Sequence, residues 1–574
     1  MRRLFLIFLA LIAITLPAVA QAKHPFTFED MMKLKRVGEP EVSPDGKWVI
    51  FSVVDVDLAA NTKTPHIWIV PTTGGQEREI IADQDADRPR WAPDGKRFAF
   101  LSMKEGGSQV WIADFDDAAG KVERAFKFTS IATEASGELW SPDGKNILFT
   151  SDVYPECDGQ SDEVACDAKK LDEANKSKVK AQIFTHLLYR HWNAYKEGKR
   201  THIFVDSIFE IPPAGRSMGD HPASIPRDLT PGDYDAPVFS LGGQDNYAFS
   251  PDGQEICYTS NHDKNPAAST NNDLWIVPVN GAADASSAEV LAKTKNITAD
   301  NPASDSTPLY SPDGRYIAYR AQQRPGYESD RFRLMLYDRK TGEKKNLTED
   351  FDGWVGTMTW LGPVLLFSSE QEGQSPIFYT SPNGQQPRKI LDGFLDDLTY
   401  SEKSGVAAYT RMSLEAPTQI FVSALSWGRL AHGNPSKPSN QPPFVNLGIS
   451  DRLTHLNDAV LTQVAMSPLE SFWFNGAHND KVEGFLVKPP NFDASKKYPV
   501  KFLIHGGPQG AWGDDWSYRW NPELFASPTS STPSGYVVIM INFHGSTGYG
   551  QKFIDAINGD WGGAPFEDLM KGLD

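Results

Sequence analysis

Apolar and polar residues alternate along most of this chain in short runs separated by turn-forming residues. Five runs begin with a similar phrase, in which Pro-Asp-Gly precedes the alternating residues. These phrases are VSPDGKWVIFS from Val42, WAPDGKRFAFLS from Trp91, WSPDGKNILFTS from Trp140, FSPDGQEICYTS from Phe249 and YSPDGRYIAYR from Tyr310. Proline presets φ, aspartate bonds its own backbone, and glycine accepts a positive φ. Each phrase therefore predicts a turn that leads into a strand.

Short aromatic strands form a second series, which gives the number of units. They are HIWIV at His66, QVWIA at Gln109, HIFVD at His202, DLWIV at Asp273, LMLYD at Leu334, IFYTS at Ile377 and QIFVS at Gln419. The last two follow degenerate turn phrases, WLGPVLLFSS and YSEKSGVAAYT. The first three turn phrases are spaced 49 residues apart, which suits units of four strands. We predict an all-β seven-bladed propeller over residues 30–450, with a long insertion in the blade between Asp143 and Asp252.

The pattern changes after Ala431–Pro443, a stretch rich in proline, serine and asparagine that predicts a loop or linker. YPVKFLIHGGPQGAW (498–512) then predicts a buried strand that ends in glycines. GYVVIMINFHGSTGYG (535–550) predicts another strand and a glycine-rich loop, and a helix is expected from Pro565. This order is typical of the front half of an α/β sheet, so residues 455–574 are predicted to form the first part of an α/β domain.

The first residues predict export. Arg2 and Arg3 precede the apolar run LFLIFLALIAITLPA, and small residues follow in AVAQA. A charged start, an apolar middle and an A-x-A site are typical of a secretory signal peptide, which we assign to residues 1–22, with cleavage after Ala20 or Ala22. The mature protein is expected in the periplasm. The alternative is an uncleaved membrane anchor, although the apolar run is short for a bilayer span.

Length and charge narrow the functional classes. A chain of 574 residues is too long for one hydrophobic core, so two or more domains are expected. The net charge of −18 and the absence of a long lysine- or arginine-rich block disfavour binding to nucleic acid or to an anionic membrane. We expect no cofactor and no metal, and the sequence does not indicate an oligomeric state.

The chain has three cysteines. Cys157 and Cys166 bracket the polar loop DGQSDEVA, and a disulfide between them would suit an exported protein. The alternatives are two free thiols or a weak metal site. Cys257 lies in the strand-like run EICYTS, where it is expected to be a small buried residue.

Several of these features together resemble one family. Seven turn-and-strand units, then HGGP (His505–Pro508), then NFHGSTGYG (Asn542–Gly550), are similar to the prolyl oligopeptidase family of serine peptidases. The insertion LLYRHWNAYKEGKRTHIFV (Leu187–Val205) resembles the dipeptidyl-peptidase V and acylaminoacyl-peptidase branch more specifically. The resemblance covers nearly the whole mature chain. It implies an α/β-hydrolase catalytic domain, of which residues 455–574 are the N-terminal half.

The resemblance also implies a role for the glycine turn. In the family the His-Gly-Gly-Pro turn supplies part of the oxyanion hole, which assigns this role to His505, Gly506 and Gly507, with the N–H of Gly507 as donor. A preorganised N–H group stabilises the charge that develops on a peptide carbonyl oxygen by ~3 kcal/mol. His505 and Pro508 are expected to shape the turn. The alternative is a tight turn without catalytic meaning.

No nucleophile is expected in this chain. The nucleophile elbow has the pattern Gly-x-Ser-x-Gly, and the one match is GRSMG, Gly215–Gly219. Prolines flank it, and it precedes the HGGP turn, which is the wrong order for the family, so Ser217 is interpreted as a decoy. Ser546 has glycine neighbours without the elbow spacing and is interpreted as a loop residue. The serine, acid and histidine of the family come later than the helix at Pro565, so the sequence is interpreted as cut at its C-terminus.

Two functions from different classes remain. The first is a secreted serine exopeptidase that removes dipeptides or acylated residues from oligopeptide N-termini, with this chain inactive because the triad is missing. The second is a non-catalytic periplasmic propeller that binds a partner. The HGGP segment favours the first.

Overall fold

The computed structural model describes residues 23–574 except 83, 161, 186, 209–225, 241–243, 281–285, 429–442 and 508. The predicted signal peptide (1–22) and the GRSMG motif with Ser217 therefore lie outside the described residues. No helix in the described part of the chain is long and apolar enough to cross a membrane.

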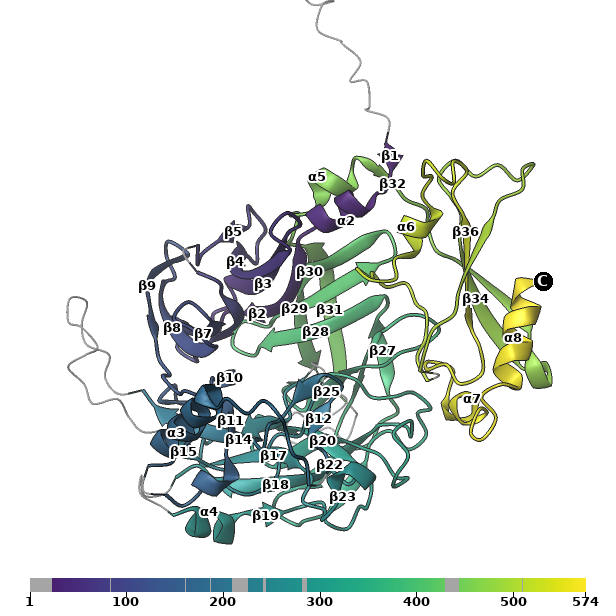
Figure 1. Ribbon diagram of the computed structural model, residues 1–574. Helices are drawn as coiled ribbons and strands as arrows, with labels where there is room; N and C mark the ends of the chain where they lie inside the picture. Colours follow the sequence, from purple (N-terminus) through teal and green to yellow (C-terminus); the bar gives the residue numbers. More distant parts are fainter. Residues whose placement is uncertain are drawn as a thin grey trace, which may run out of the picture.

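Seven four-stranded antiparallel sheets follow one another between Arg36 and Arg452, and we call them the sheet array (Figure 1). In each sheet, every strand pairs with the next strand of the same sheet along the chain, and in the third sheet β11 therefore pairs with β14. The first four sheets are β2 (Arg36–Val42), β3 (Trp48–Asp57), β4 (Thr62–Pro71), β5 (Arg78–Glu79); β6 (Asp87–Trp91), β7 (Arg97–Ser102), β8 (Gln109–Asp116), β9 (Lys121–Lys127); β10 (Ser136–Trp140), β11 (Asn146–Val153), β14 (Arg200–Ser207), β15 (Arg227–Asp228); and β16 (Tyr247–Phe249), β17 (Glu255–Ser260), β18 (Asp273–Pro278), β19 (Lys295–Asn296). The last three are β20 (Asp305–Tyr310), β21 (Tyr316–Ala321), β22 (Arg333–Asp338), β23 (Lys344–Asn346); β24 (Met358–Leu361), β25 (Val364–Ser368), β26 (Ile377–Thr380), β27 (Arg388–Leu391); and β28 (Phe394–Ser401), β29 (Val406–Ser413), β30 (Ala416–Gly428), β31 (Phe444–Arg452).

Each predicted Pro-Asp-Gly turn lies between the first and second strands of a sheet, as the phrase at Pro44 does between β2 and β3. The aromatic strand of each unit is the third strand of its sheet. Most residues of the second and third strands are buried. Buried clusters join neighbouring sheets, and one of them joins the first sheet to the seventh through Phe51, Ala408 and Ile420. In Figure 1 the purple first sheet accordingly lies beside the green seventh sheet.

A threonine hydroxyl near the end of five units fixes the third strand. Its Oγ1 accepts the backbone N–H of a residue near the start of that strand at 2.8 to 2.9 Å. The five pairs are Thr129 with Val110, Thr230 with Ile203, Thr298 with Leu274, Thr348 with Leu334 and Thr454 with Ile420. The same hydrogen bond therefore recurs from unit to unit, although the turn phrases do not include it.

The predicted insertion lies in the third sheet, between β11 and β14. It contains α3 (Glu163–Lys176) and a small hairpin, β12 (Arg190–His191) and β13 (Ala194–Tyr195). Cys157 and Cys166 form a disulfide, with their Cα atoms 5.6 Å apart, and Cys257 is a buried free cysteine of β17.

Residues 431–442 of the predicted loop or linker lie outside the described residues. Strands β30 and β31, on either side of it, pair with each other in the seventh sheet. β31 has mostly exposed or half-buried residues and no apolar alternation. The change of architecture comes after Arg452.

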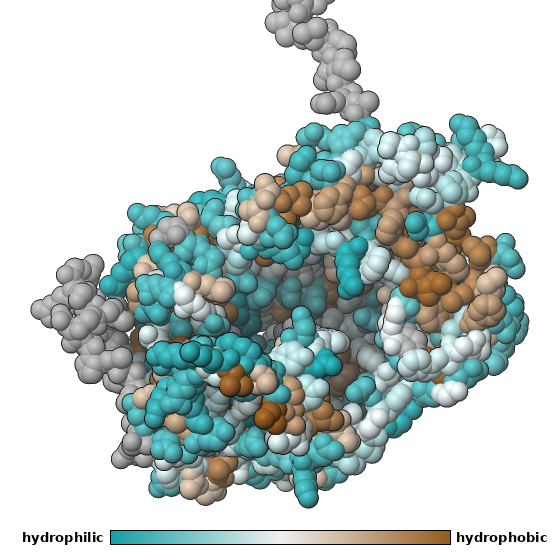
Figure 2. Space-filling view, in the orientation of Figure 1, coloured by the Kyte–Doolittle hydropathy of each residue, from teal (hydrophilic) through white to brown (hydrophobic). Residues whose placement is uncertain are grey.

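A mixed sheet follows, which we call the C-terminal sheet. Its order is β33 (Glu470–Asn475), β34 (Lys481–Val487), β36 (Val537–Asn542) and β35 (Val500–Leu503), and only β35 and β36 run parallel. Its helices are α6 (Pro522–Ala526), α7 (Gln551–Asp555) and α8 (Ala564–Leu573), the last as predicted from Pro565. Strand β35 is an edge strand in the described sheet, and Val500 on it is 48% exposed. Figure 2 shows apolar residues gathered on this side of the molecule.

The N-terminal segment packs against the C-terminal part of the chain. β1 (His24–Pro25) pairs parallel with β32 (Val464–Ala465), and α2 (Phe28–Lys33) begins with a capping box at Thr27. The helix α4 (Ser287–Lys293) covers the fourth sheet, and α5 (Asp458–Leu461) follows the seventh. The buried ring of Phe26 meets Trp516 edge to face at 5.7 Å between centroids. Residues from both ends of the chain thus share one core.

Candidate active site

The predicted HGGP turn begins directly after β35, at the carboxyl end of the two parallel strands. Gly506 and Gly507 are exposed, and Gly507 has φ of +129°. A Cβ atom at Gly507 would lie 2.6 to 2.9 Å from backbone atoms of Gln509, whereas a Cβ at Gly506 would meet nothing within 4 Å. The backbone of the turn is therefore open to solvent, and its shape requires glycine at Gly507.

His505 connects this turn to the loop after β36. Its Nε2 lies 2.9 Å from Ser546 Oγ, and its ring stacks on Phe543 at 4.3 Å between centroids. Burial lowers the pKa of His505, so the imidazole is neutral at pH 7. Ser546 Oγ donates to the carbonyl of Phe543 at 2.7 Å.

This serine–histidine contact has the spacing of a nucleophile and its base, but its chemistry is structural. Ser546 is completely buried, and its hydroxyl proton is held by a backbone carbonyl. Nδ1 of His505 faces the carbonyl of Gly506, where a triad would place a carboxylate. Ser546 is a loop residue as predicted, and it has a role in packing that the sequence did not reveal.

A second histidine, His544, holds the other side of the same loop. Its Nδ1 lies 2.6 Å from the carboxylate of Asp568 in α8, and the same carboxylate accepts the backbone N–H groups of His544 and Ala477. Burial alone would lower the pKa of His544, but the hydrogen bond to Asp568 outweighs it and raises the pKa. Asp568 is completely buried, so this pair fixes α8 to the sheet.

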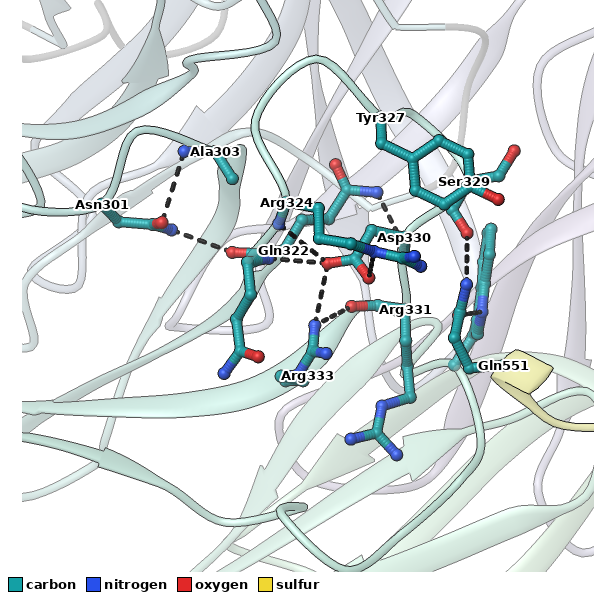
Figure 3. Close-up of polar contacts among 12 residues, drawn as sticks. Asn301, Ala303, Gln322, Arg324, Tyr327, Ser329, Asp330, Arg331, Arg333 and Gln551 are labelled. Carbon is teal, nitrogen blue, oxygen red and sulfur yellow. Dashed lines mark hydrogen bonds and ion pairs between the residues drawn. The ribbon is translucent and has the colours of Figure 1, made fainter. Parts of the chain in front are cut away.

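The loop after β36 also contacts the sheet array. Thr547 Oγ1 donates to Glu370 at 2.6 Å. Farther along, both terminal nitrogens of Arg324 donate to Asp555 of α7 at 2.9 Å, and Gln551 Nε2 donates to the carbonyl of Ser329. Figure 3 shows the buried Asp330 carboxylate in the loop that presents Arg324. Asp330 accepts from Arg324 Nε and from Arg333, which holds the loop in shape for these contacts (Figure 3).

One cluster in the described residues has the composition of a metal site. Asp158, His202 and Asp228 place three potential ligand atoms within 4.8 Å of one another. However, His202 Nε2 lies 2.9 Å from the carbonyl of Gly232, and Nδ1 lies 2.6 Å from Asp228. Burial opposes protonation, but the Asp228 carboxylate outweighs it and raises the pKa of His202 to about 9. An imidazolium with both nitrogens donating has no lone pair for a metal, so the cluster is an ion pair.

Comparisons with known proteins show a resemblance to one family. A profile of the prolyl oligopeptidase family matches residues 516–574. A dipeptidyl-peptidase 5 of Porphyromonas gingivalis is 29% identical over 578 residues, which cover 98% of this chain and 74% of the relative. The chain resembles the prolyl oligopeptidase family over nearly its whole length. A dipeptidyl-peptidase 5 of Arthroderma otae is 28% identical, over 96% of this chain and 72% of the relative.

The fold agrees with this resemblance. An acylaminoacyl peptidase of Pyrococcus horikoshii superposes with a TM-score of 0.68 at 18% identity, over 96% of this chain and 71% of that one. The resemblance to these proteins indicates a serine peptidase. The structure brings His505, Gly506 and Gly507 together as the predicted turn, and their oxyanion role stays a prediction.

Sequence reasoning did not identify three residues that hold the turn: Asn542, Ser546 and Thr547. All three belong to NFHGSTGYG, which entered only as part of the resemblance. The available signal was the position of Asn542, because a polar residue at the end of a strand parallel to β35 lies near the turn that follows β35.

Proposed function

We propose that this protein is a secreted exopeptidase of the dipeptidyl-peptidase or acylaminoacyl-peptidase type, which acts on oligopeptide N-termini. The observation that carries the proposal is the exposed glycine turn at the end of β35, with the constrained backbone at Gly507. A peptide carbonyl oxygen that approaches this turn accepts a hydrogen bond from Gly507 N–H, and the bond strengthens as the oxygen gains negative charge. The printed names of the relatives, dipeptidyl-peptidase 5 and acylaminoacyl peptidase, support this substrate class.

We further propose that the sheet array is a closed seven-bladed propeller, and that residues 455–574 are the N-terminal half of an α/β-hydrolase domain. Seven sheets of four strands and the packing of the first sheet on the seventh support the first part. The parallel pairing of β35 with β36 supports the second. A propeller beside a catalytic domain would restrict access to short or unfolded peptides.

Export to the periplasm is part of the same proposal. The charged and apolar pattern of residues 1–22 supports it, and so does the Cys157–Cys166 disulfide, because such bonds persist in oxidising compartments.

We also propose that the 574-residue chain does not itself cleave peptides. The support is chemical: the GRSMG motif has the wrong context for an elbow, and the hydroxyl of Ser546 is buried and already bonded.

Chromogenic substrates test these proposals. Dipeptidyl substrates with a free amino group and acylated aminoacyl substrates are assayed with this chain, with its Ser217→Ala variant, and with any longer product of the gene. We expect no turnover from the first two and turnover from a longer product. Turnover by this chain that Ser217→Ala abolishes would refute the assignment of the site. Peptide binding without turnover by every product would favour the non-catalytic propeller.

A further inference from the structure

The exposed glycines lie in the middle of a segment that is fixed at both ends. This segment, His505–Trp512, is the oxyanion turn. At its start His505 Nε2 lies 2.9 Å from Ser546 Oγ, and near its end the carbonyl of Gly510 accepts the backbone N–H of Thr547 at 3.0 Å. Between these points Gly506 and Gly507 are exposed. The position of the Gly507 N–H therefore depends on the residues that hold the two ends.

Asn542, the last residue of β36, makes the strongest of these attachments. Its side chain accepts the N–H of Trp512 at 2.8 Å and donates to the carbonyl of Trp512 at 2.9 Å. Two hydrogen bonds to one residue fix both its position and the direction of its peptide groups. Asn542 is completely buried, so water does not compete for these bonds.

A buried network fixes the orientation of the Asn542 amide. The second N–H of its Nδ2 donates to the hydroxyl of Tyr549 at 2.7 Å, and that hydroxyl donates to Glu483 at 2.6 Å. Glu483 accepts in addition from Ser471. A rotated amide would direct its NH₂ group at the N–H of Trp512, so the network permits one orientation only.

We propose that Asn542 and Ser546 are positioning residues that hold the oxyanion turn in the shape required for catalysis. They act through Trp512 and His505, and neither is placed to touch the substrate. The inference rests on the proposed function for its catalytic meaning, but the mechanical part, that these two side chains fix the turn, holds for the chain as it is.

Residues 546–548 link the oxyanion turn to the sheet array. Thr547, whose backbone holds Gly510, donates its hydroxyl to Glu370, and Gly548 accepts the N–H of Glu372. A displacement of loop 369–374 relative to the C-terminal sheet would therefore act on the turn through residues 546–548. Contacts with the C-terminal sheet and with the sheet array thus both position the turn.

Hydrogen exchange of the full 574-residue chain tests the mechanical part. In Asn542→Ala we expect amide exchange to rise at least tenfold in peptides that cover residues 505–512, with exchange in the sheet array unchanged. The matched control is Asn457→Ala, because Asn457 makes the same two hydrogen bonds to the N–H and carbonyl of Lys35, at 2.8 and 2.9 Å. The control should loosen the segment at Lys35 and leave residues 505–512 as in the wild type.

An unchanged exchange rate over residues 505–512 in a folded Asn542→Ala protein would overturn the inference. If this variant does not fold, Ser546→Ala, which removes the hydroxyl that contacts His505 Nε2 and keeps the backbone, carries the same test with the same expected local rise.

Kinetics test the catalytic part separately. In a gene product that cleaves peptides, Asn542→Ala should lower kcat by 10- to 100-fold and change KM less than threefold, because the donor acts mainly on the transition state. An equal loss through KM alone would overturn the positioning role. Faster local exchange combined with no peptidase activity in any product would preserve the mechanical part and refute the proposed function.

Discussion

Two adjacent glycines in the oxyanion turn differ in whether their positions tolerate a side chain. Gly507 has φ of +129° and a Cβ position that collides with the backbone of Gln509, while Gly506 has free space. A methyl group at Gly507 therefore forces the turn to move, and a methyl group at Gly506 does not.

We expect Gly507→Ala to lower kcat/KM of an active gene product by at least 100-fold, since a displaced oxyanion donor costs about 3 kcal/mol. Gly506→Ala is the control and should retain activity within about fivefold. In the 574-residue chain, Gly507→Ala should also change hydrogen exchange over residues 505–512. Equal effects of the two substitutions would contradict the steric argument.

His202 carries a pH dependence of stability. Its folded pKa is raised to about 9 from 6.5, so the folded protein retains a proton that the unfolded chain loses. The stabilisation is complete below pH 6.5 and is lost as the pH rises to 9, and its size is ~2–3 kcal/mol. We expect the Tm of the wild type to fall over this interval more steeply than that of His202→Gln.

The control for this prediction is His455→Gln, because His455 is largely exposed and pairs with Asp458 at the surface. It should follow the wild-type curve. Parallel curves for wild type and His202→Gln would show that the His202–Asp228 pair does not titrate in this range.

At the scale of elements, the turn phrases and the threonines fix the same sheets in different ways. The turns set where the second strand begins, and the threonine hydroxyls hold the start of the third strand. In the fourth sheet, Thr298 accepts the N–H of Leu274 and donates to Asp273 at 3.1 Å, and it is completely buried.

Thr298→Val keeps the shape of this side chain but leaves the buried N–H of Leu274 without its partner and removes one of the two side-chain hydrogen bonds to Asp273. We expect the free energy of unfolding to fall by about 1–3 kcal/mol, measured by urea denaturation. Thr62→Val, on an exposed position of β4, should change it by less than about 0.5 kcal/mol. A neutral Thr298→Val would mean that the repeated hydrogen bond is incidental.

Sequence patterns predicted the elements better than they predicted the site. Pro-Asp-Gly dictates its own turn locally, so each turn was found between the expected strands. The threonines were missed because each one bonds a residue 14 to 34 positions earlier, although Leu-Thr or Ile-Thr recurs at Thr230, Thr298, Thr348 and Thr454. The contacts of Asn542 and Ser546 depend on the parallel pairing of β35 and β36, which no local pattern encodes.

At the scale of the whole molecule, the packing of the first sheet on the seventh joins the ends of the array. Phe51 is completely buried in the cluster that contains Ala408 and Ile420. A cavity at this position should weaken the contact between the first and last sheets as well as the local core.

We expect Phe51→Ala to lower the free energy of unfolding by about 3–5 kcal/mol and to make residues 36–57 sensitive to limited proteolysis. The control is Phe28→Ala in α2, where the side chain is 47% exposed. Similar losses in the two variants would indicate that the junction contributes no more than an ordinary surface position.

The junction between the first and seventh sheets has a consequence for synthesis. Phe51 emerges from the ribosome about 370 residues before Ile420, its partner in the closing cluster. At a translation rate of ~5–20 residues per second, the apolar side chain of Phe51 lacks this partner for roughly 20–70 s, until the seventh sheet has been synthesised. A nascent chain of this protein therefore carries an open β surface through most of its translation, and a factor that shields such surfaces would raise its yield more than a change in the stability of the finished fold.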